Sequence, residues 1–231
     1  MDRSPARIEN AEDFAKRFAV SRETLERLKT YEALLKQWQK TINLVAPSTL
    51  GDIWHRHFAD SAQLLTLAPP GAKRWLDLGS GAGFPGLVLA ILLAERGIGP
   101  VTLIESDTRK AAFLAEVARR TGVPVDIRGT RIEKTATQAN VVSRETDDAA
   151  AWDVVTARAL APLPRLLELV APFFANATIG LFLKGREAQV EVEAAQQSWD
   201  FAFDLHPSLT DTAGRIVVIR ALKPKTEGHA Q

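Results

Sequence analysis

A glycine-rich turn between a short apolar segment and an apolar helix limits what this chain can fold into more than any other feature. Asp77 and Leu78 lead into the turn, which has glycines at 79, 81 and 83 and is followed by the apolar run 87–93. Glycine has no Cβ and adopts positive φ easily, so the backbone of this turn can lie directly against a ligand. Pro85 suits the first turn of a helix, whose free N–H groups face the same ligand. The pattern predicts a strand, a ligand-binding turn and a helix in succession.

A second acidic residue marks the end of the next apolar run. Residues 101–104 are apolar or β-branched, and Glu105 follows them directly. A carboxylate at the end of the second strand of such a sheet is where the hydroxyls of a nucleotide ribose lie. The glycine-rich turn and Glu105 together predict a site for a nucleoside-containing cofactor.

The hydrophobic pattern changes at the linker Ala68-Pro69-Pro70-Gly71. Before the linker the pattern is helical: an apolar stripe from Leu25 to Trp38 begins after the capping residue Ser21, and a second helix is predicted over 52–67. After it, strands alternate with helices, as in a parallel sheet covered on both faces. Strands are predicted at 74–78, 101–105, 124–128, 152–157, 178–183, 199–204 and 215–221, and helices at 85–96, 108–120, 131–138, 163–174 and 187–197.

The last two predicted strands are joined by a loop too short for a crossover helix, so this pair is predicted to be antiparallel. A mostly parallel α/β sheet of seven strands with such an ending matches the class I S-adenosylmethionine-dependent methyltransferase fold better than a dinucleotide-binding sheet. We expect an N-terminal helical extension over 1–70, a cofactor-binding methyltransferase domain over 71–223 and a disordered tail over 224–231. The acidic segment 143–150 is predicted to be a surface loop.

Composition excludes several kinds of chemistry. The chain has 231 residues, no cysteine and a net charge of +1. It therefore forms no disulfide, thiolate zinc site or cysteine nucleophile, which suits a reducing cytoplasm. No apolar run is long enough to span a membrane, and residues 1–10 are too polar for a signal peptide. We expect a cytoplasmic protein without a metal site or a membrane partner and, because no heptad repeat is present, a monomer.

Residues 81–86 also satisfy the G-x-G-x-x-G pattern of dinucleotide-binding proteins. Asp77 argues against that interpretation, because its carboxylate would repel a pyrophosphate. The same carboxylate can organise the turn and face the cationic methionine end of S-adenosylmethionine. A second nucleotide-binding half with its own glycine turn is also missing from the sequence. The sequence favours a methyltransferase, and an NAD(P)-dependent oxidoreductase is the alternative.

The exit of the fourth predicted strand carries residues that bear on the choice of methyl acceptor. It lacks the Asn/Asp-Pro-Pro-aromatic loop common in enzymes that methylate exocyclic amines of bases, and pyrimidine C5 methylation requires a cysteine. A ring nitrogen such as guanine N7 attacks a sulfonium methyl without first losing a proton. That reaction depends on alignment and charge placement rather than on a general base. Arg158 is the candidate for this role, through guanine O6, an RNA phosphate or the cofactor carboxylate.

These residues and several motifs resemble the small-subunit ribosomal RNA guanine-N7 methyltransferases, the RsmG or glucose-inhibited division protein B family. The resemblance covers residues 22–221 and includes Trp38-Gln39-Lys40-Thr41-Ile42-Asn43-Leu44, Arg56-His57-Phe58-Ala59-Asp60-Ser61, Arg158-Ala159 and Leu183-Lys184-Gly185. It implies a bacterial cytoplasmic enzyme that transfers a methyl group from S-adenosylmethionine to N7 of a loop guanine near the decoding centre of 16S rRNA. The implied partner is small-subunit ribosomal RNA or the small ribosomal subunit.

The resemblance also assigns residues to the site. The residues that would bind S-adenosylmethionine are Gly79, Phe84, Ile132, Glu133 and Arg158, with Glu105 on the ribose and with Asp77 and Gly81 in the turn. The basic residues that would surround the RNA-facing opening are Arg109, Lys110, Arg131, Lys184 and Arg215.

His55 and His57 are interpreted as hydrogen-bonded structural residues rather than general bases, because both lie on an apolar helix. His57 and Asp60 are three residues apart, which predicts a local side-chain pair. Two further functions stay open: a methyltransferase with another acceptor, and a non-catalytic ribosome-binding protein that keeps the methyltransferase fold as a scaffold.

Overall fold

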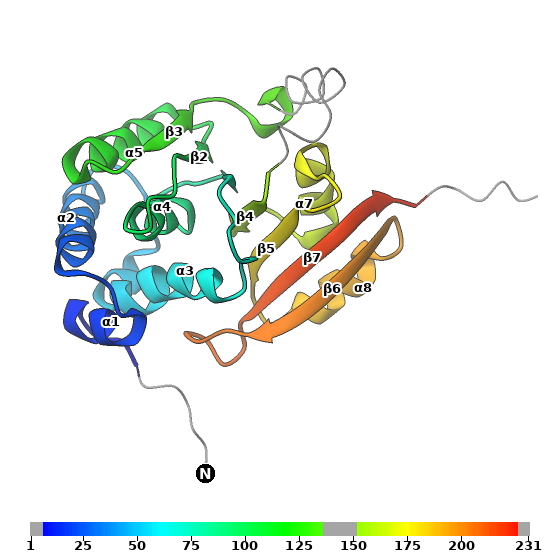
Figure 1. The fold of residues 1–231 in the computed structure, drawn as a ribbon, viewed down its shortest axis with the longest axis horizontal. Helices are drawn as coiled ribbons and strands as arrows, with labels where there is room; N and C mark the ends of the chain where they lie inside the picture. Colours follow the sequence, from blue (N-terminus) through cyan, green and yellow to red (C-terminus); the bar gives the residue numbers. More distant parts are fainter. Residues whose placement is uncertain (1–6, 136–151, 226–231) are drawn as a thin grey trace, which may run out of the picture.

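The computed structural model describes residues 7–135 and 152–225. Within these ranges the chain forms a seven-stranded sheet in the order β3-β2-β1-β4-β5-β7-β6 (Figure 1). The strands are β1 (Trp75–Leu78), β2 (Val101–Ile104), β3 (Val125–Arg128), β4 (Val154–Arg158), β5 (Ile179–Lys184), β6 (Trp199–Pro207) and β7 (Arg215–Pro224). Neighbours from β3 to β5 pair in parallel, and β7 runs antiparallel to both β5 and β6. The predicted class I methyltransferase architecture is confirmed, including the antiparallel last strand.

Helices cover both faces of the sheet (Figure 1). The helices on the first face are α1 (Ala11–Phe18), α2 (Arg22–Trp38), α3 (Asp60–Ala62), α4 (Gly86–Ala94) and α5 (Thr108–Thr121), and those on the second are α7 (Leu163–Val170) and α8 (Ala188–Ala195). Because side chains alternate along a strand, Trp75 joins the first core and Leu76 and Leu78 join the second. The first core is continuous across residue 70, since Tyr31 and Phe58 pack into it together with Phe113. The predicted division at residue 70 therefore does not separate two cores.

The helical extension differs from the prediction in two places. Helix α1 was missed, although Asn10 caps it by accepting a hydrogen bond from the backbone of Asp13 at 2.9 Å. The second helix predicted over 52–67 is present as an unbroken helical segment, but it is not a regular α-helix. The structure has the 3₁₀ helix η1 (Pro47–Asp52), the π-helical turn η2 (Trp54–Ala59), the short α3 and the 3₁₀ helix η3 (Gln63–Thr66). Helix α2 begins after Ser21, as predicted.

A side-chain contact accompanies the widened turn. The backbone N–H of Asp60 bonds to the carbonyl of His55, five residues earlier. The carbonyl of Arg56, which an α-helix would offer to Asp60, accepts a hydrogen bond from Arg158 at 3.2 Å instead. Single π-turns of this kind are frequent at functional sites.

Three predictions fall wholly or partly outside the described residues: the surface loop at 143–150, the end of the helix over 131–138 and the tail beyond residue 225. The start of the tail is corrected, because β7 extends to Pro224 and the backbone N–H of Lys225 bonds to Ser198 at 2.9 Å. In the part of the chain that the structure describes, no helix combines the length and hydropathy needed to cross a membrane.

Candidate active site

A cavity of about 400 Å³ lies where β1, β2, β3 and β4 end. Its lining consists of Gly79, Gly81, Ile104, Glu105, Ser106, Lys110, Thr130, Arg131, Ile132, Glu133, Ala159, Leu160 and Leu169. Five of the predicted cofactor-binding residues are among them: Gly79, Gly81, Glu105, Ile132 and Glu133. The carboxyl ends of parallel strands meet at one edge of a sheet, which is why these separate motifs come together. We call this space the cofactor-side cavity.

Glu105 is held in place by backbone groups on both sides. Its Oε2 accepts a hydrogen bond from the N–H of Gly81 at 2.7 Å, and its Oε1 accepts one from Asp107 at 2.7 Å. The residue is only 8 % exposed. Each carboxylate oxygen keeps a further lone pair, so Glu105 can still accept hydrogen bonds from a pair of ligand hydroxyls.

The glycine-rich turn is close to its neighbours at two positions. Gly79 has φ +66°, and a Cβ there would lie 2.7 Å from Cδ1 of Leu160. Gly83 has φ +92°, and a Cβ there would lie 2.8 Å from Cβ of Leu87 and would overlap the hydroxyl of Tyr31. Both positions therefore require glycine for backbone conformation and for space.

Phe84 does not line the cofactor-side cavity. Its ring is 3 % exposed and lies between Tyr31, at a centroid distance of 5.3 Å, and His57, at 4.8 Å. The hydroxyl of Tyr31 donates a hydrogen bond to the backbone oxygen of Ala82. Tyr31 and His57, both in the helical extension, thus pack against the turn on either side of Phe84. The predicted contact between Phe84 and the cofactor stays a prediction.

Asp77 is fully buried beneath the turn and does not line the cofactor-side cavity. Its partner is Thr156, its register neighbour on β4, which donates to Oδ1 at 2.7 Å. Oδ2 has no hydrogen-bond partner among the described residues. Burial raises the pKa of Asp77 to about 6, and the hydrogen bond from Thr156 opposes that rise. The structure therefore places Asp77 as a support of the turn, and its predicted contact with the cofactor stays a prediction.

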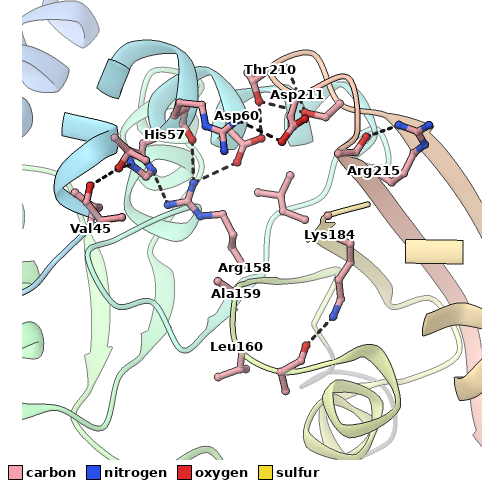
Figure 2. A pocket seen from close by; sticks show the side chains of 18 of the residues that line it. Val45, His57, Asp60, Arg158, Ala159, Leu160, Lys184, Thr210, Asp211 and Arg215 are labelled. Carbon is pink, nitrogen blue, oxygen red and sulfur yellow. Dashed lines mark hydrogen bonds and ion pairs between the residues drawn. The ribbon is translucent and has the colours of Figure 1, made fainter. Parts of the chain in front are cut away.

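Figure 2 shows a second cavity, of about 800 Å³. The two share Ala159 and Leu160 as lining residues. Ala159 has φ +51°, a left-handed conformation that is uncommon outside glycine and that recurs at functional sites. The segment that follows β4 is therefore the wall between the two spaces. We call the second space the acceptor-side cavity.

Arg158 lines the acceptor-side cavity (Figure 2). It is not among the residues that line the cofactor-side cavity. Its Nη2 lies 2.9 Å from Nδ1 of His57, and its Nη1 donates to Oδ2 of Asp60 at 3.2 Å. The guanidinium carbon lies 4.9 Å from the centre of the Phe84 ring. The predicted pair between His57 and Asp60 is replaced by an arrangement in which both side chains bind Arg158.

Asp60 also ties the β6–β7 loop to the site. Its Oδ1 accepts hydrogen bonds from Oγ1 of Thr210 at 2.8 Å and from Nε2 of Gln63 at 2.9 Å. Arg56 forms an ion pair with Asp211 at 3.3 Å in the same loop. The sequence assigned no site role to Asp60 or Thr210, although the Arg-His-x-x-Asp spacing was the signal that marked the first of them.

Gln39 gives a structural reason for the motif at residues 38–44 of the extension. Its Oε1 accepts hydrogen bonds from the N–H groups of Leu44 and Val45, both at 3.0 Å, and its Nε2 donates to the Val45 carbonyl at 2.8 Å. Leu44 and Val45 line the acceptor-side cavity. The side chain of Gln39 therefore shapes one wall of that cavity without lining it.

The structure places the five predicted RNA-binding residues in three locations. Lys110 and Arg131 line the cofactor-side cavity, Lys184 and Arg215 line the acceptor-side cavity, and Arg109 lines a hollow of about 330 Å³ beside Asn43, which Lys110 also reaches. Lys184 is largely buried, because its Nζ donates to the carbonyl of Ala161 at 2.6 Å and to Glu191 at 2.7 Å. The RNA contacts of all five stay predictions. The residues that the structure describes contain no cluster of side chains able to hold a metal ion.

The sheet order and the two adjoining cavities at its carboxyl edge define a class I methyltransferase. Solved structures with the same fold include the fibrillarin/Nop5p complex, at 13 % identity and a TM-score of 0.52 over 70 % of this chain and 80 % of that chain. A mutant of MtNAS is similar at 14 % identity and a TM-score of 0.51, over 91 % of this chain and 75 % of that one.

The family is shown by sequence. The GidB family model, described as rRNA small subunit methyltransferase G, matches residues 24–216, and the chain belongs to this family. Ribosomal RNA small subunit methyltransferase G of Parvibaculum lavamentivorans is 50 % identical over 93 % of this chain and 91 % of its own length. The protein of the same name from Methylobacterium nodulans is 54 % identical over 88 % of this chain and 92 % of its own. The chain is therefore a methyltransferase, which decides against the oxidoreductase alternative.

Proposed function

We propose that this protein transfers a methyl group from S-adenosylmethionine to N7 of a guanine in 16S ribosomal RNA. The observation that carries the proposal is the pair of cavities that meet at Ala159 and Leu160. The cofactor-side cavity has the glycine-rich turn and the Glu105 carboxylate, which suit a nucleoside. The acceptor-side cavity has Arg158 at its wall. The substrate named by the 50 %-identical relatives supports the choice of ribosomal RNA.

The residues of the cofactor-side cavity fit S-adenosylmethionine. Its volume of about 400 Å³ is within the usual range for small-molecule sites. Glu105 would accept the ribose hydroxyls, and Ile132 and Leu160 offer apolar walls for a purine. The absence of side chains at Gly79 and Gly81 lets a ligand lie against the backbone. When bound, this cofactor supplies a methyl group on a positively charged sulfur.

The acceptor side needs no general base, because the lone pair of guanine N7 is free to attack. The protein holds the base and the donor in line, which is the main contribution that alignment makes to a bimolecular step. Arg158 would donate to the guanine O6 or pair with a neighbouring phosphate, and so hold the base in place. The positive charge passes from the sulfur to the base during transfer, so the role of the guanidinium is alignment rather than stabilisation of the developing charge. A guanine in an RNA loop is partly unstacked, which lowers the cost of bringing it into the cavity.

The test is transfer of labelled methyl groups. The protein is incubated with labelled S-adenosylmethionine and small ribosomal subunits from cells that lack the modification, and in parallel with protein-free 16S RNA. We expect label in the RNA as N7-methylguanine, and the comparison of the two substrates shows whether the assembled subunit is needed. Label that enters a small molecule, or another base, would move the acceptor elsewhere. Cytoplasmic location and a monomeric state are further predictions, the second to be checked by light scattering.

A further inference from the structure

We propose that His57, as the neutral imidazole that carries its proton on Nε2, is the positioning residue that orients the guanidinium of Arg158 in the wall of the acceptor-side cavity. The proposal rests on the proposed function, because Arg158 would act there on the methyl acceptor. His57 lies on η2 in the helical extension, 101 residues from Arg158 in the chain. The two side chains meet in Figure 2.

A chain of hydrogen bonds assigns the tautomer of His57. Oγ1 of Thr49 donates to the carbonyl of Ala46 at 2.7 Å. A hydroxyl has a single hydrogen, so the same oxygen must accept in its 2.8 Å contact with Nε2 of His57. Nε2 therefore carries the proton, and Nδ1 has a free lone pair. Arg158 can only donate, and its Nη2 lies 2.9 Å from that lone pair. Every bond in the chain thus has one direction.

The surroundings of His57 keep the ring neutral. It is 8 % exposed and stacks on Phe84, with ring planes 23° apart. Burial, together with the nearby charges of Arg158 and Arg56, lowers the pKa of His57 to about 3. A proton on Nδ1 would turn the acceptor into a donor and place two cations face to face. The ring therefore acts as a fixed acceptor and does not take part in proton transfer.

The two ends of the guanidinium are held differently. Nη1 has two acceptors, Oδ2 of Asp60 and the carbonyl of Arg56, both at 3.2 Å. Nη2 is held by the His57 ring. Loss of this acceptor leaves the guanidinium tied at one end, so its plane is free to turn over the Phe84 ring. Orientation rather than the presence of the positive charge is what His57 controls.

A pair of amide substitutions separates the two ring nitrogens. The oxygen of Asn in His57→Asn reaches the position of Nδ1 and keeps an acceptor for Arg158. The amide in His57→Gln reaches the position of Nε2 and keeps the contact with Thr49 only. We expect His57→Gln to lower kcat for methyl transfer on the order of ten- to a hundredfold, the scale of a misaligned reacting group, and His57→Asn to lower it by about threefold or less. The KM for S-adenosylmethionine stays unchanged in both, because His57 does not line the cofactor-side cavity.

The effect of His57→Gln is measured again in an Arg158→Ala background. If His57 acts through Arg158, the second substitution causes no further loss beyond about twofold. Losses that multiply, or equal losses in His57→Asn and His57→Gln, would show a general structural role and overturn the proposal. Thermal unfolding of each variant identifies any loss of activity that comes from misfolding. Among folded variants, the ratio of kcat in His57→Asn to kcat in His57→Gln then decides whether the acceptor at Nδ1 matters.

A readout without substrate separates this proposal from the proposed function. ¹⁵N NMR of the His57 ring is expected to show a proton on Nε2 between about pH 5 and pH 8, and a shift of the Nδ1 resonance in Arg158→Ala. A proton on Nδ1, or titration in that range, would overturn the proposal. If this signature is present but no RNA is methylated, the proposed function fails and the His57–Arg158 assignment stands.

Discussion

The ring of Tyr31 stacks on the ring of Phe84, with centroids 5.3 Å apart and planes 16° apart. Tyr31 belongs to α2 in the helical extension, and Phe84 belongs to the glycine-rich turn. Burial raises the pKa of the Tyr31 hydroxyl well above its ordinary value, so the group remains protonated and donates to Ala82. The extension is thus in direct contact with the turn that borders the cofactor-side cavity, and changes on one side of this contact are expected to act on the other.

Gly83→Ala is expected to lower the free energy of unfolding by about 2–4 kcal/mol, because the new Cβ would overlap Tyr31 and Leu87 in a left-handed backbone conformation. Gly71→Ala is the matched control: its φ is +79°, but a Cβ there meets nothing within 4 Å. The control is expected to cost about 1 kcal/mol from conformation alone. Urea unfolding measures both. Equal losses would mean that the backbone conformation, not the contact with Tyr31, requires glycine at position 83.

Glu105→Gln is expected to weaken binding of S-adenosylmethionine at least tenfold, about 1.4 kcal/mol. The amide keeps the size of the side chain, but its NH₂ group would face one of the two backbone N–H groups that the carboxylate now accepts. Isothermal titration calorimetry gives the dissociation constant. Glu193→Gln on α8, an exposed residue that lines neither cavity, is the control and should bind as the parent does. Parent-like binding by both variants would remove Glu105 from the cofactor site.

Asp77 is expected to make stability depend on pH. Its pKa is about 6 in the folded protein and about 3.9 in an unfolded chain. The folded state therefore binds the proton more tightly, and this contribution is complete below about pH 4 and lost as pH rises through 6. The two-unit difference corresponds to about 3 kcal/mol.

Asp77→Asn isolates this contribution, because the amide can keep the hydrogen bond from Thr156 without a charge. Relative to the parent, the variant should gain free energy of unfolding between pH 4 and pH 7, as measured by urea unfolding at both values. A difference between variant and parent that does not change with pH would show that Asp77 has an ordinary pKa.

Lys184 and Arg109 are expected to behave in opposite ways. Lys184→Ala leaves Glu191 and the Ala161 carbonyl without their cation and should lower the free energy of unfolding by about 3 kcal/mol. Arg109→Ala removes a side chain that is 71 % exposed and should change stability by less than about 0.5 kcal/mol. If Arg109 binds a phosphate, its loss should lower the slope of RNA affinity against salt by about one. Urea unfolding and RNA binding at several salt concentrations separate the two roles, and an equal fall in slope for Lys184→Ala would make that residue an RNA contact.

Local signals in the sequence were sufficient for most of the fold. The seven strands follow from apolar runs, and their ends and the cap at Ser21 follow from the glycine, proline and serine residues between those runs. The cofactor-side cavity was predictable in outline, because parallel strands bring their carboxyl ends together whatever the details of packing. Most of its lining residues follow the ends of β1 to β4 within a few positions.

The environment of Arg158 was beyond such reasoning. Its three partners, Arg56, His57 and Asp60, are 98 to 102 residues away, and all three lie in or next to the π-helical turn η2. The position of Phe84 behind the turn has the same origin, since the ring is placed by aromatic side chains of the extension. Contacts that form only after distant segments pack leave no periodic signal in either segment.

The column of rings formed by Tyr31, Phe84 and His57 has a consequence for engineering. A chimaera that joins this catalytic sheet to the leading helices of a relative would need matching ring sizes at both sides of the junction, even though the residues are far apart in the chain. A shortened chain that starts at residue 71 would expose Phe84 to solvent and remove the hydrogen-bond partners of Arg158. The leading helices and the sheet are therefore best exchanged or redesigned together, as a single unit.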